Sequence, residues 1–207
     1  MFLLKESDLN LRIVGCGDGP ASFNSTLSKR GGSVVSIDPL YIFNAEQIRG
    51  RIAETYETVL DQMRQNRGDY VWEMISSVEE LARVRKFSMD EFLTDYEAGK
   101  KERRYLAGEL PSLPLKPGQF DLALCSHFLF LYSAHLTVKF HLDAIRDMLR
   151  VATEVRVFPL LTLNGTRSPH ADHVIEALNN AGLIAEIRRV PYEFQRGGNE
   201  MLLVKRA

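Results

Sequence analysis

The chain has 207 residues, a length typical of one α/β domain, and its composition of 45% hydrophobic and 26% charged residues excludes a disordered polypeptide. Its 26 basic and 27 acidic residues give a net charge of −1, which provides no global attraction to nucleic acid or to an anionic membrane. Two cysteines without metal-type spacing, and no apolar run suited to a signal peptide or a membrane span, predict a reduced, cytoplasmic protein without a bound metal.

The N-terminal part of the chain predicts a βαβ unit. Leu11–Val14 is an apolar run that suits a buried parallel strand, and it leads into glycines at positions 15, 17 and 19. Pro20 suits the first turn of a following helix. The β-branched run Ser33–Ile37 then predicts a second strand, which ends at Asp38. This order of strand, glycine loop, helix and strand is the beginning of a doubly wound sheet.

The segment 41–101 is longer than a crossover between neighbouring parallel strands requires. Apolar residues at helical spacing predict one helix from about Ala45 to Gln65, and shorter helical pieces around Tyr70–Ile75, Val78–Val84 and Met89–Tyr96. We interpret this segment as a helical cap that covers a substrate. Helices that merely pad one face of the sheet are the alternative.

Alternation of strands and helices resumes after this insertion. Three strands, two helices and a closing hairpin are predicted, at Arg104–Ala107, Phe120–Cys125 and Glu154–Phe158, at His141–Leu149 and Ser168–Asn180, and at Ile184–Val190 with Met201–Lys205. We therefore predict an α/β domain over residues 1–207. It has a Rossmann-like, doubly wound, mostly parallel sheet, an antiparallel C-terminal edge strand and a helical insertion after strand 2. The basic run Lys100–Arg104 is interpreted as a solvated loop beside a strand.

The spacing of the three glycines distinguishes between classes of ligand. The pattern is GxGxG, whereas the dinucleotide fingerprint is GxGxxG. Pro20 stands where that fingerprint has its third glycine, and it lacks an N–H group that a pyrophosphate needs. A nicotinamide-dependent oxidoreductase is therefore the weakest of the alternatives, and the Gly-Lys-Ser/Thr of a P-loop is absent.

The stretch VGCGDG at residues 14–19 resembles the first motif of the class I S-adenosylmethionine-dependent methyltransferases. Asp38 matches the acid that holds the ribose hydroxyls in that family, and FDLALCSH at residues 120–127 is similar to its fourth-strand region. The resemblance covers Leu11 to Lys205 apart from the insertion, and it implies S-adenosylmethionine as the cofactor. The residues implied to bind it are Gly15, Cys16, Gly17, Asp18, Gly19, Asp38, Pro39, Glu109, Leu110 and Ser126.

The same resemblance implies methyl transfer to a small-molecule acceptor, with neither nucleic acid nor a membrane as partner. His127 is the candidate catalytic base because an unperturbed histidine titrates near neutrality; a histidine that only packs beside the cofactor is the alternative. Two positions depart from the family. Ile13 replaces an acid near the methionine end of the cofactor, and Phe130-Leu131 replaces a Glu-His pair. These departures keep open a second hypothesis, a non-catalytic cofactor-binding or interaction protein with the methyltransferase fold.

Four ring-bearing side chains are further candidates for the walls of the site: Tyr41, Trp72, Tyr132 and His135. For Tyr41, Trp72 and Tyr132 the alternative is packing in the core or the cap.

Overall fold

The computed structural model describes all residues, 1–207, and contains one seven-stranded sheet in the order β3-β2-β1-β4-β5-β7-β6. The strands are β1 Arg12–Cys16, β2 Ser33–Ile37, β3 Tyr105–Leu106, β4 Leu122–Ser126, β5 Glu154–Phe158, β6 Leu183–Arg189 and β7 Glu200–Arg206. Neighbours from β3 through β5 pair in parallel, whereas β7 pairs antiparallel with both β5 and β6. The predicted doubly wound, mostly parallel sheet is confirmed.

The antiparallel C-terminal strand is also confirmed, but its predicted position at the edge is wrong. β7 lies between β5 and β6, and β6 forms the edge. The side chains explain this order. β7 buries Met201, Leu202 and Val204, whereas β6 buries only Ala185 and carries charged residues that suit an edge facing water.

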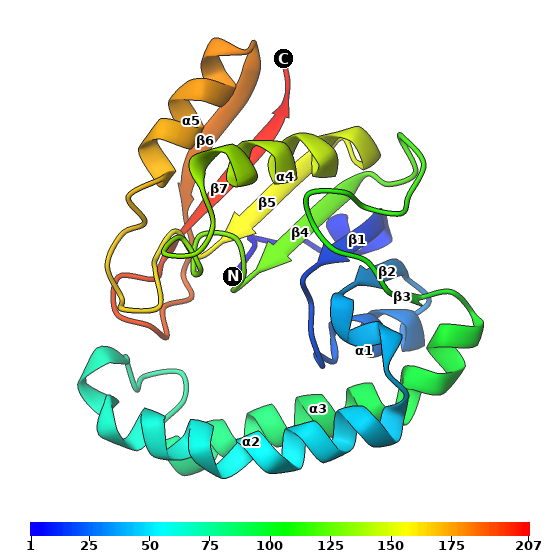
Figure 1. Cartoon of the computed structure of the whole chain (residues 1–207), viewed down its shortest axis with the longest axis vertical. Helices are drawn as coiled ribbons and strands as arrows, with labels where there is room; N and C mark the ends of the chain where they lie inside the picture. The colour runs from blue at the N-terminus through cyan, green and yellow to red at the C-terminus, as the bar shows by residue number, and fades with distance from the viewer.

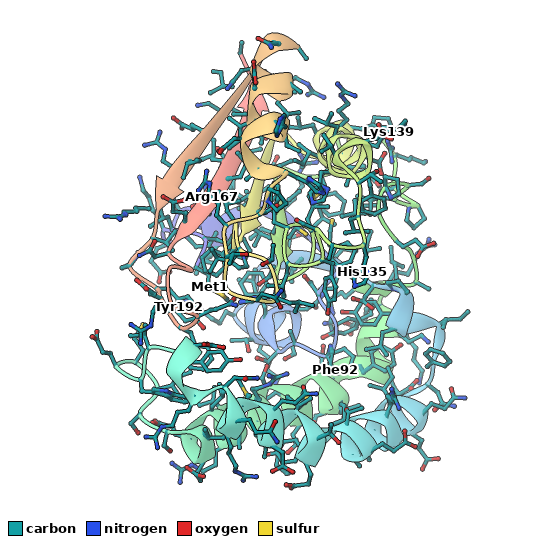
Figure 2. All side chains as sticks on the ribbon, turned by 60° about the vertical axis from the view of Figure 1, so that its left-hand side comes forward. Met1, Phe92, His135, Lys139, Arg167 and Tyr192 are labelled. Atoms are coloured by element: carbon teal, nitrogen blue, oxygen red, sulfur yellow. The ribbon has the colours of Figure 1, made fainter.

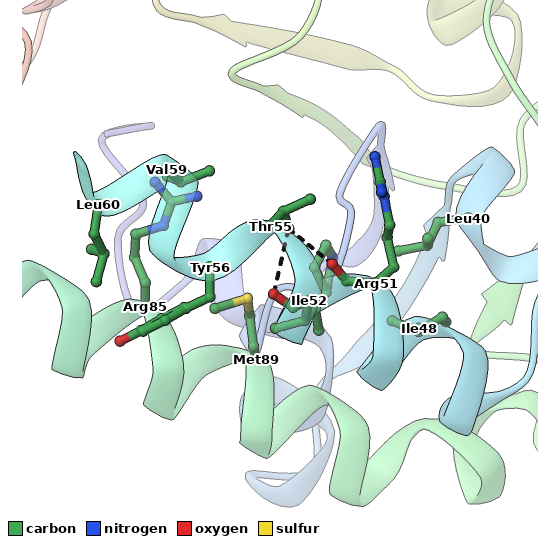
Figure 3. A pocket seen from close by; sticks show the side chains of 11 residues that line it. Leu40, Ile48, Arg51, Ile52, Thr55, Tyr56, Val59, Leu60, Arg85 and Met89 are labelled. Carbon is green, nitrogen blue, oxygen red and sulfur yellow. Dashed lines mark hydrogen bonds between the residues drawn. The ribbon is translucent and has the colours of Figure 1, made fainter. Parts of the chain in front are cut away.

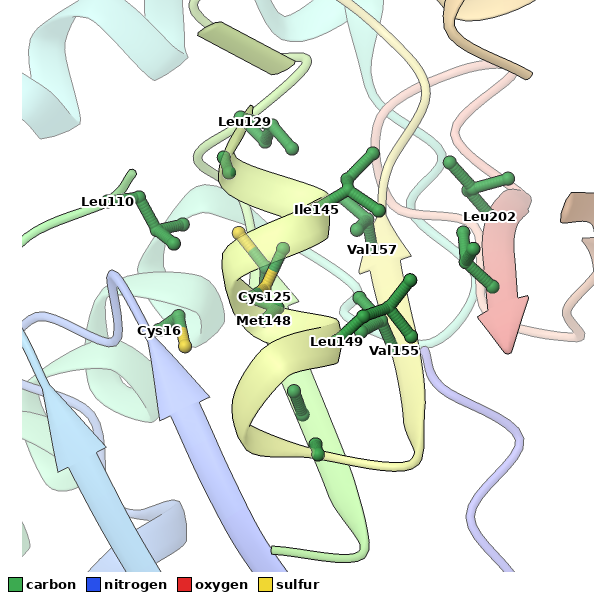
Figure 4. Close-up of a cluster of buried hydrophobic side chains, with 14 of the residues drawn as sticks. Cys16, Leu110, Cys125, Leu129, Ile145, Met148, Leu149, Val155, Val157 and Leu202 are labelled. Carbon is green, nitrogen blue, oxygen red and sulfur yellow. The ribbon is translucent and has the colours of Figure 1, made fainter. Parts of the chain in front are cut away.

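Helices cover both faces of the sheet. α4 (Val138–Val151) and α5 (Ala171–Asn180) bury their apolar sides on one face, where the core includes Ile145, Met148 and Val155 (Figure 4). On the other face, Leu27 of α1 (Phe23–Lys29) and Phe2 of the N-terminal segment pack against the sheet. Helix α1 begins at Phe23, so the expectation that Pro20 occupies its first turn is wrong.

The insertion between β2 and β3 is a pair of long helices, α2 (Ala45–Gln65) and α3 (Val78–Lys101). The bounds predicted for the first helix are confirmed. The two short pieces predicted after residue 77 form one continuous helix, α3, which begins where the Ser77 hydroxyl accepts from the Glu80 amide. The helical piece predicted at Tyr70–Ile75 is wrong, because the backbone there pairs with another segment: Val71 N donates to the Phe194 carbonyl at 2.7 Å.

Both ends of the insertion are held by aromatic contacts. At the base, Tyr41, Phe92, Tyr96 and Tyr105 form one cluster; they join α3 to β3 and to the 3-10 helix Pro39–Ile42. At the tip, next to the 3-10 helix Arg67–Asp69, Tyr70 stacks on Phe194 of the β6–β7 connection with ring centroids 4.9 Å apart. The carboxyl ends of β4 and β5 point toward α2 and α3 (Figure 1), so the insertion spans the edge of the sheet where ligands bind in doubly wound folds. A further 3-10 turn covers Asp8–Asn10. None of the helices has the length and apolar character needed to cross a membrane.

Candidate functional site

The glycine loop follows β1 and turns directly beneath the carboxyl edge of the sheet. Gly17 and Gly19 have φ angles of +72° and +59°, a left-handed conformation that favours glycine over other residues. At Gly15 the reason is different, since a Cβ there would overlap the carboxylate of Asp18 and would displace it. The loop therefore favours glycine at each of the three positions.

The carboxylate of Asp38, at the end of β2, is fixed by two backbone amides. Its Oδ2 accepts from Gly19 N at 2.9 Å, and its Oδ1 accepts from Leu40 N at 2.8 Å. Desolvation raises the pKa of Asp38, and the two amide hydrogen bonds oppose that rise. Each oxygen keeps lone-pair capacity, so the carboxylate can accept from two further donors such as vicinal hydroxyls.

Asp18 points back over Gly15, where its Oδ2 accepts from the Ser36 hydroxyl at 2.5 Å. The pKa of Asp18 is raised to about 7, chiefly by desolvation and also by the neighbouring Asp38, although the Ser36 hydrogen bond opposes the rise. No lysine, arginine or histidine pairs with Asp18. The ionised carboxylate of Asp18 is therefore poorly stabilised within the protein, and a cation bound beside it would stabilise its charge.

A chain of hydrogen bonds joins Asp18 to the insertion. Behind Ser36, the buried Asn24 donates to the Ser36 hydroxyl at 3.1 Å and accepts from Arg104 Nη1 at 2.8 Å. Arg104 in turn forms a bidentate pair with Asp95 of α3, at 2.6 and 2.9 Å. The Arg104 side chain is only 16% exposed, so its interpretation as part of a solvated loop is wrong. The sequence offers no local sign of this hydrogen-bond network, because directly bonded members are up to 80 residues apart.

A cavity of about 820 Å³ opens beside these carboxylates. Nine of the ten residues predicted to bind a cofactor line it: Cys16, Gly17, Asp18, Gly19, Asp38, Pro39, Glu109, Leu110 and Ser126. The tenth, Gly15, borders a second cavity instead. Cys16 is fully buried, and desolvation raises the pKa of its thiol well above the usual value. The thiol is therefore unreactive and only lines the cavity wall. The volume is in the range of small-molecule sites.

The second cavity, of about 730 Å³, lies between α3, the N-terminal segment and the loop after β6. Met1 and Tyr192, which both line it, lie close together on the side of the sheet that faces the insertion (Figure 2). Four residues border both cavities: Asp18, Arg85, Ser126 and His127. These residues mark the place where ligands in the two cavities would meet.

His127 occupies this junction with a φ angle of +52°, in the left-handed region. Its Nδ1 lies 2.8 Å from the Ser126 hydroxyl. Desolvation lowers the pKa of His127, and the guanidinium of Arg85 lowers it further, so the ring is neutral at physiological pH. In the tautomer whose Nδ1–H donates to Ser126, Nε2 keeps a free lone pair and can accept a proton.

The structure also assigns places to the four ring-bearing candidates. Tyr132 lines the first cavity, whereas His135 lines neither and lies on the sheet side of the insertion (Figure 2). Trp72 belongs to the aromatic contact at the tip of the insertion. Tyr41 is 2% exposed, and its hydroxyl donates to the Gly19 carbonyl at 2.8 Å. The sequence does not predict this hydrogen bond to the glycine loop, because only the tertiary packing brings the Tyr41 ring there.

Ile13 is fully buried among Leu122, Leu124 and Leu27, so an acid at this position would be buried in an apolar cluster. The carboxylate of Asp18 instead reaches back over the end of the same strand.

Comparison with known proteins places the chain in a family. No protein-family model matches it. Over its full 207 residues it is 30% identical to the uncharacterized protein MJ0045 of Methanocaldococcus jannaschii, and the match spans 90% of that protein. The chain belongs to the family of this archaeal protein.

Solved structures identify the fold. A methyltransferase of Methanosarcina mazei described as S-adenosylmethionine-dependent matches with a TM-score of 0.51 at 13% identity, over 98% of this chain and 94% of the other. Magnesium protoporphyrin IX methyltransferase of Synechocystis PCC 6803, in a structure with bound S-adenosylmethionine, matches with a TM-score of 0.50 at 13% identity, over 98% of this chain and 73% of the other. The expected methyltransferase fold is confirmed.

Proposed function

We propose that this protein is an S-adenosylmethionine-dependent methyltransferase that acts on a small molecule. The observation that carries the proposal is the first cavity, in which nine of ten expected cofactor residues meet, with two carboxylates beside the glycine loop. The residues fit the cofactor chemically. Asp38 can accept from the ribose hydroxyls, Leu110 offers an apolar surface to the adenine, and Asp18 can pair with the amino group of the methionine part.

When bound, S-adenosylmethionine supplies a methyl group on a cationic sulfur; an acceptor lone pair forms the new bond, and the sulfur keeps the electrons of the broken one. The protein's task is to align the acceptor, which lies in the second cavity, with the methyl group of the cofactor in the first cavity. An acceptor that begins protonated can release its proton to Nε2 of His127, which is neutral and borders both cavities. Leu81 and Arg85 of α3 line the second cavity, so the insertion forms part of the wall around the acceptor.

Calorimetric titration with S-adenosylmethionine and S-adenosylhomocysteine tests the proposal. We expect micromolar binding of both by the wild type, and a loss of at least about tenfold in Asp38→Ala, equal to about 1.4 kcal/mol. Release of S-adenosylhomocysteine in the presence of a panel of small acceptors then tests turnover. A folded wild-type protein that binds neither ligand would contradict the proposal. Binding without turnover on any acceptor would favour a non-catalytic protein with the same fold.

Tyr41→Phe is expected to reduce the free energy of unfolding by about 1 kcal/mol, because the half-buried Gly19 carbonyl loses one of its two donors and keeps only Ala21 N. We also expect the affinity for S-adenosylhomocysteine to fall a few-fold, since the glycine loop is less firmly held. Tyr56→Phe is the matched control: its hydroxyl donates to the Ala82 carbonyl at 3.0 Å within the insertion. Urea unfolding and calorimetry should show a similar stability loss in the control with unchanged ligand affinity. Equal ligand affinities in all three proteins would exclude this role of Tyr41.

A further inference from the structure

The second cavity combines an apolar wall with very few charged side chains. Eleven of its 18 lining residues are hydrophobic, among them Phe2, Leu124 and Tyr192. Asp18 is its only carboxylate, and Arg85 is its only lysine or arginine side chain. Asp18 lies at the border with the first cavity, where the proposed cofactor brings its own cationic groups. Arg85 lies at the same border and is, apart from Asp18, the only charged side chain of the second cavity; the α-amino group of Met1, whose charge also lowers the pKa of His127, is a second cationic group there.

Arg85 is the basic residue of α3 that borders the two large cavities, and it has no partner within the protein. The next residue, Lys86, pairs with Asp90 at 2.9 Å, and Lys100 donates to the Phe43 carbonyl. Arg85 forms no ion pair or hydrogen bond, although it borders three cavities. Its side chain rises from α3 toward Val59 of α2, beside the small cavity between the two helices (Figure 3).

The surroundings of Arg85 complement an anion. The first cavity has three acidic residues, Asp18, Asp38 and Glu109, that suit a cationic cofactor, whereas the neutral ring of His127 adds no positive charge at the junction. A guanidinium presents donors in a planar fork that matches a carboxylate or a phosphate. Such an anion bound at the mouth of an apolar cavity would fix the orientation of the molecule inside it.

We infer that the second cavity binds an amphipathic, anionic acceptor whose apolar body lies against the cavity wall and whose carboxylate or phosphate pairs with Arg85. This inference rests on the proposed function, because it identifies the second cavity with the acceptor site. It assigns Arg85 the task of orienting the acceptor beside His127.

The test uses three probes that share one apolar ring system: naphthalene-2-carboxylate, 2-naphthyl phosphate and the uncharged naphthalene-2-carboxamide. Each is titrated by calorimetry into the wild-type protein saturated with S-adenosylhomocysteine. We expect one molecule of at least one anion to bind, at least tenfold more tightly than the amide. The stronger of the two anions identifies the acceptor's charged group. Arg85→Gln should abolish the preference for the anion, and Arg85→Lys should retain part of it.

Arg51→Gln is the matched control, since Arg51 lies on α2 beside the small cavity and is paired with Glu54 on the surface. We expect this variant to keep the full preference. Equal binding of anion and amide by the wild type, no binding of any probe, or an unchanged preference in Arg85→Gln would overturn the inference. S-adenosylhomocysteine is titrated into the same samples first. Its failure to bind contradicts the proposed function, whereas its binding to all variants without an anion preference contradicts only the role of Arg85.

Discussion

Replacing Asp18 by asparagine is expected to weaken cofactor binding by about 100-fold at pH 7.5 while making the free protein more stable. The carboxylate has one hydrogen-bond donor, Ser36, and it lies close to Asp38, so its ionised form is poorly stabilised without a ligand. Pairing with the amino group of the methionine part would compensate for both effects. Asparagine keeps an oxygen for Ser36 and removes the charge, which costs roughly 2.7 kcal/mol of binding for a 100-fold loss.

The pH dependence follows from the same pKa. Because the pKa of Asp18 in the folded protein is about 7, above its usual value, the folded state holds this proton more tightly than the unfolded state does. Ionisation therefore reduces stability as the pH rises from about 4 to 7, and this cost persists above pH 7. Asp18→Asn should melt at a higher temperature than the wild type at pH 8 and at a similar temperature near pH 4. Each kcal/mol of difference in stability should shift the melting temperature by about 2–4 °C.

Cofactor binding should depend on pH in the opposite sense, because the cation needs the ionised carboxylate. Below pH 7 the wild-type affinity for S-adenosylhomocysteine should fall by up to tenfold per pH unit, with release of close to one proton on binding at pH 5.5. Calorimetry in buffers of different ionisation enthalpy measures that proton. Asp18→Asn should release none. A variant that binds as tightly as the wild type would rule out this role of Asp18.

Replacing Asp95 by alanine is expected to destabilise the protein by about 3 kcal/mol. The Asp95 side chain is 13% exposed, and it accepts from Arg104 through two bonds and from the Tyr105 hydroxyl at 2.9 Å. Its removal leaves a largely buried guanidinium without its main partner, a change that costs about 3–5 kcal/mol in buried pairs. The guanidinium holds the pKa of Asp95 below its usual value, so this contribution is present above pH 4 and is lost as the pH falls through the lowered pKa.

Two comparison variants separate the charge effect from simple truncation. The double variant Asp95→Leu with Arg104→Met removes both charges and should be less destabilised than Asp95→Ala. Glu91→Ala removes the partner of Lys29 in a pair whose lysine side chain is 54% exposed, and it should cost less than about 1 kcal/mol. Urea unfolding measures all three. A loss in Asp95→Ala no larger than in Glu91→Ala would contradict the assignment.

Local patterns in the sequence predict much of the fold and of the candidate site. The glycines at 15, 17 and 19 and the acid at Asp38 are adjacent to their strands, so their meeting at one edge follows from the parallel order of the sheet. The α2 helix was predicted with correct bounds because its apolar spacing is local. The continuity of α3 was missed because its charged middle, around Arg83 to Lys86, interrupts the apolar pattern while remaining exposed on a regular helix.

What the sequence could not predict depends on contacts between distant segments. Arg104 looks like one of several basic residues in a loop, and only the packing of α3 against β3 brings it to Asp95 and Asn24. The position of β7 inside the sheet depends on which hairpin strand buries more apolar surface against β5 and the helices. Arg85 was overlooked for the same reason, since its place beside both cavities is set by how the insertion lies over the sheet.

A crystal structure of the protein with S-adenosylhomocysteine would show whether the cofactor binds as we propose. We expect the ligand in the cavity beside the glycine loop, with both ribose hydroxyls within hydrogen-bond distance of Asp38, the adenine against Leu110 and the amino group on Asp18. We also expect the sulfur to face His127 and the second cavity. A ligand bound elsewhere, or a ribose without contact to Asp38, would contradict the proposed site.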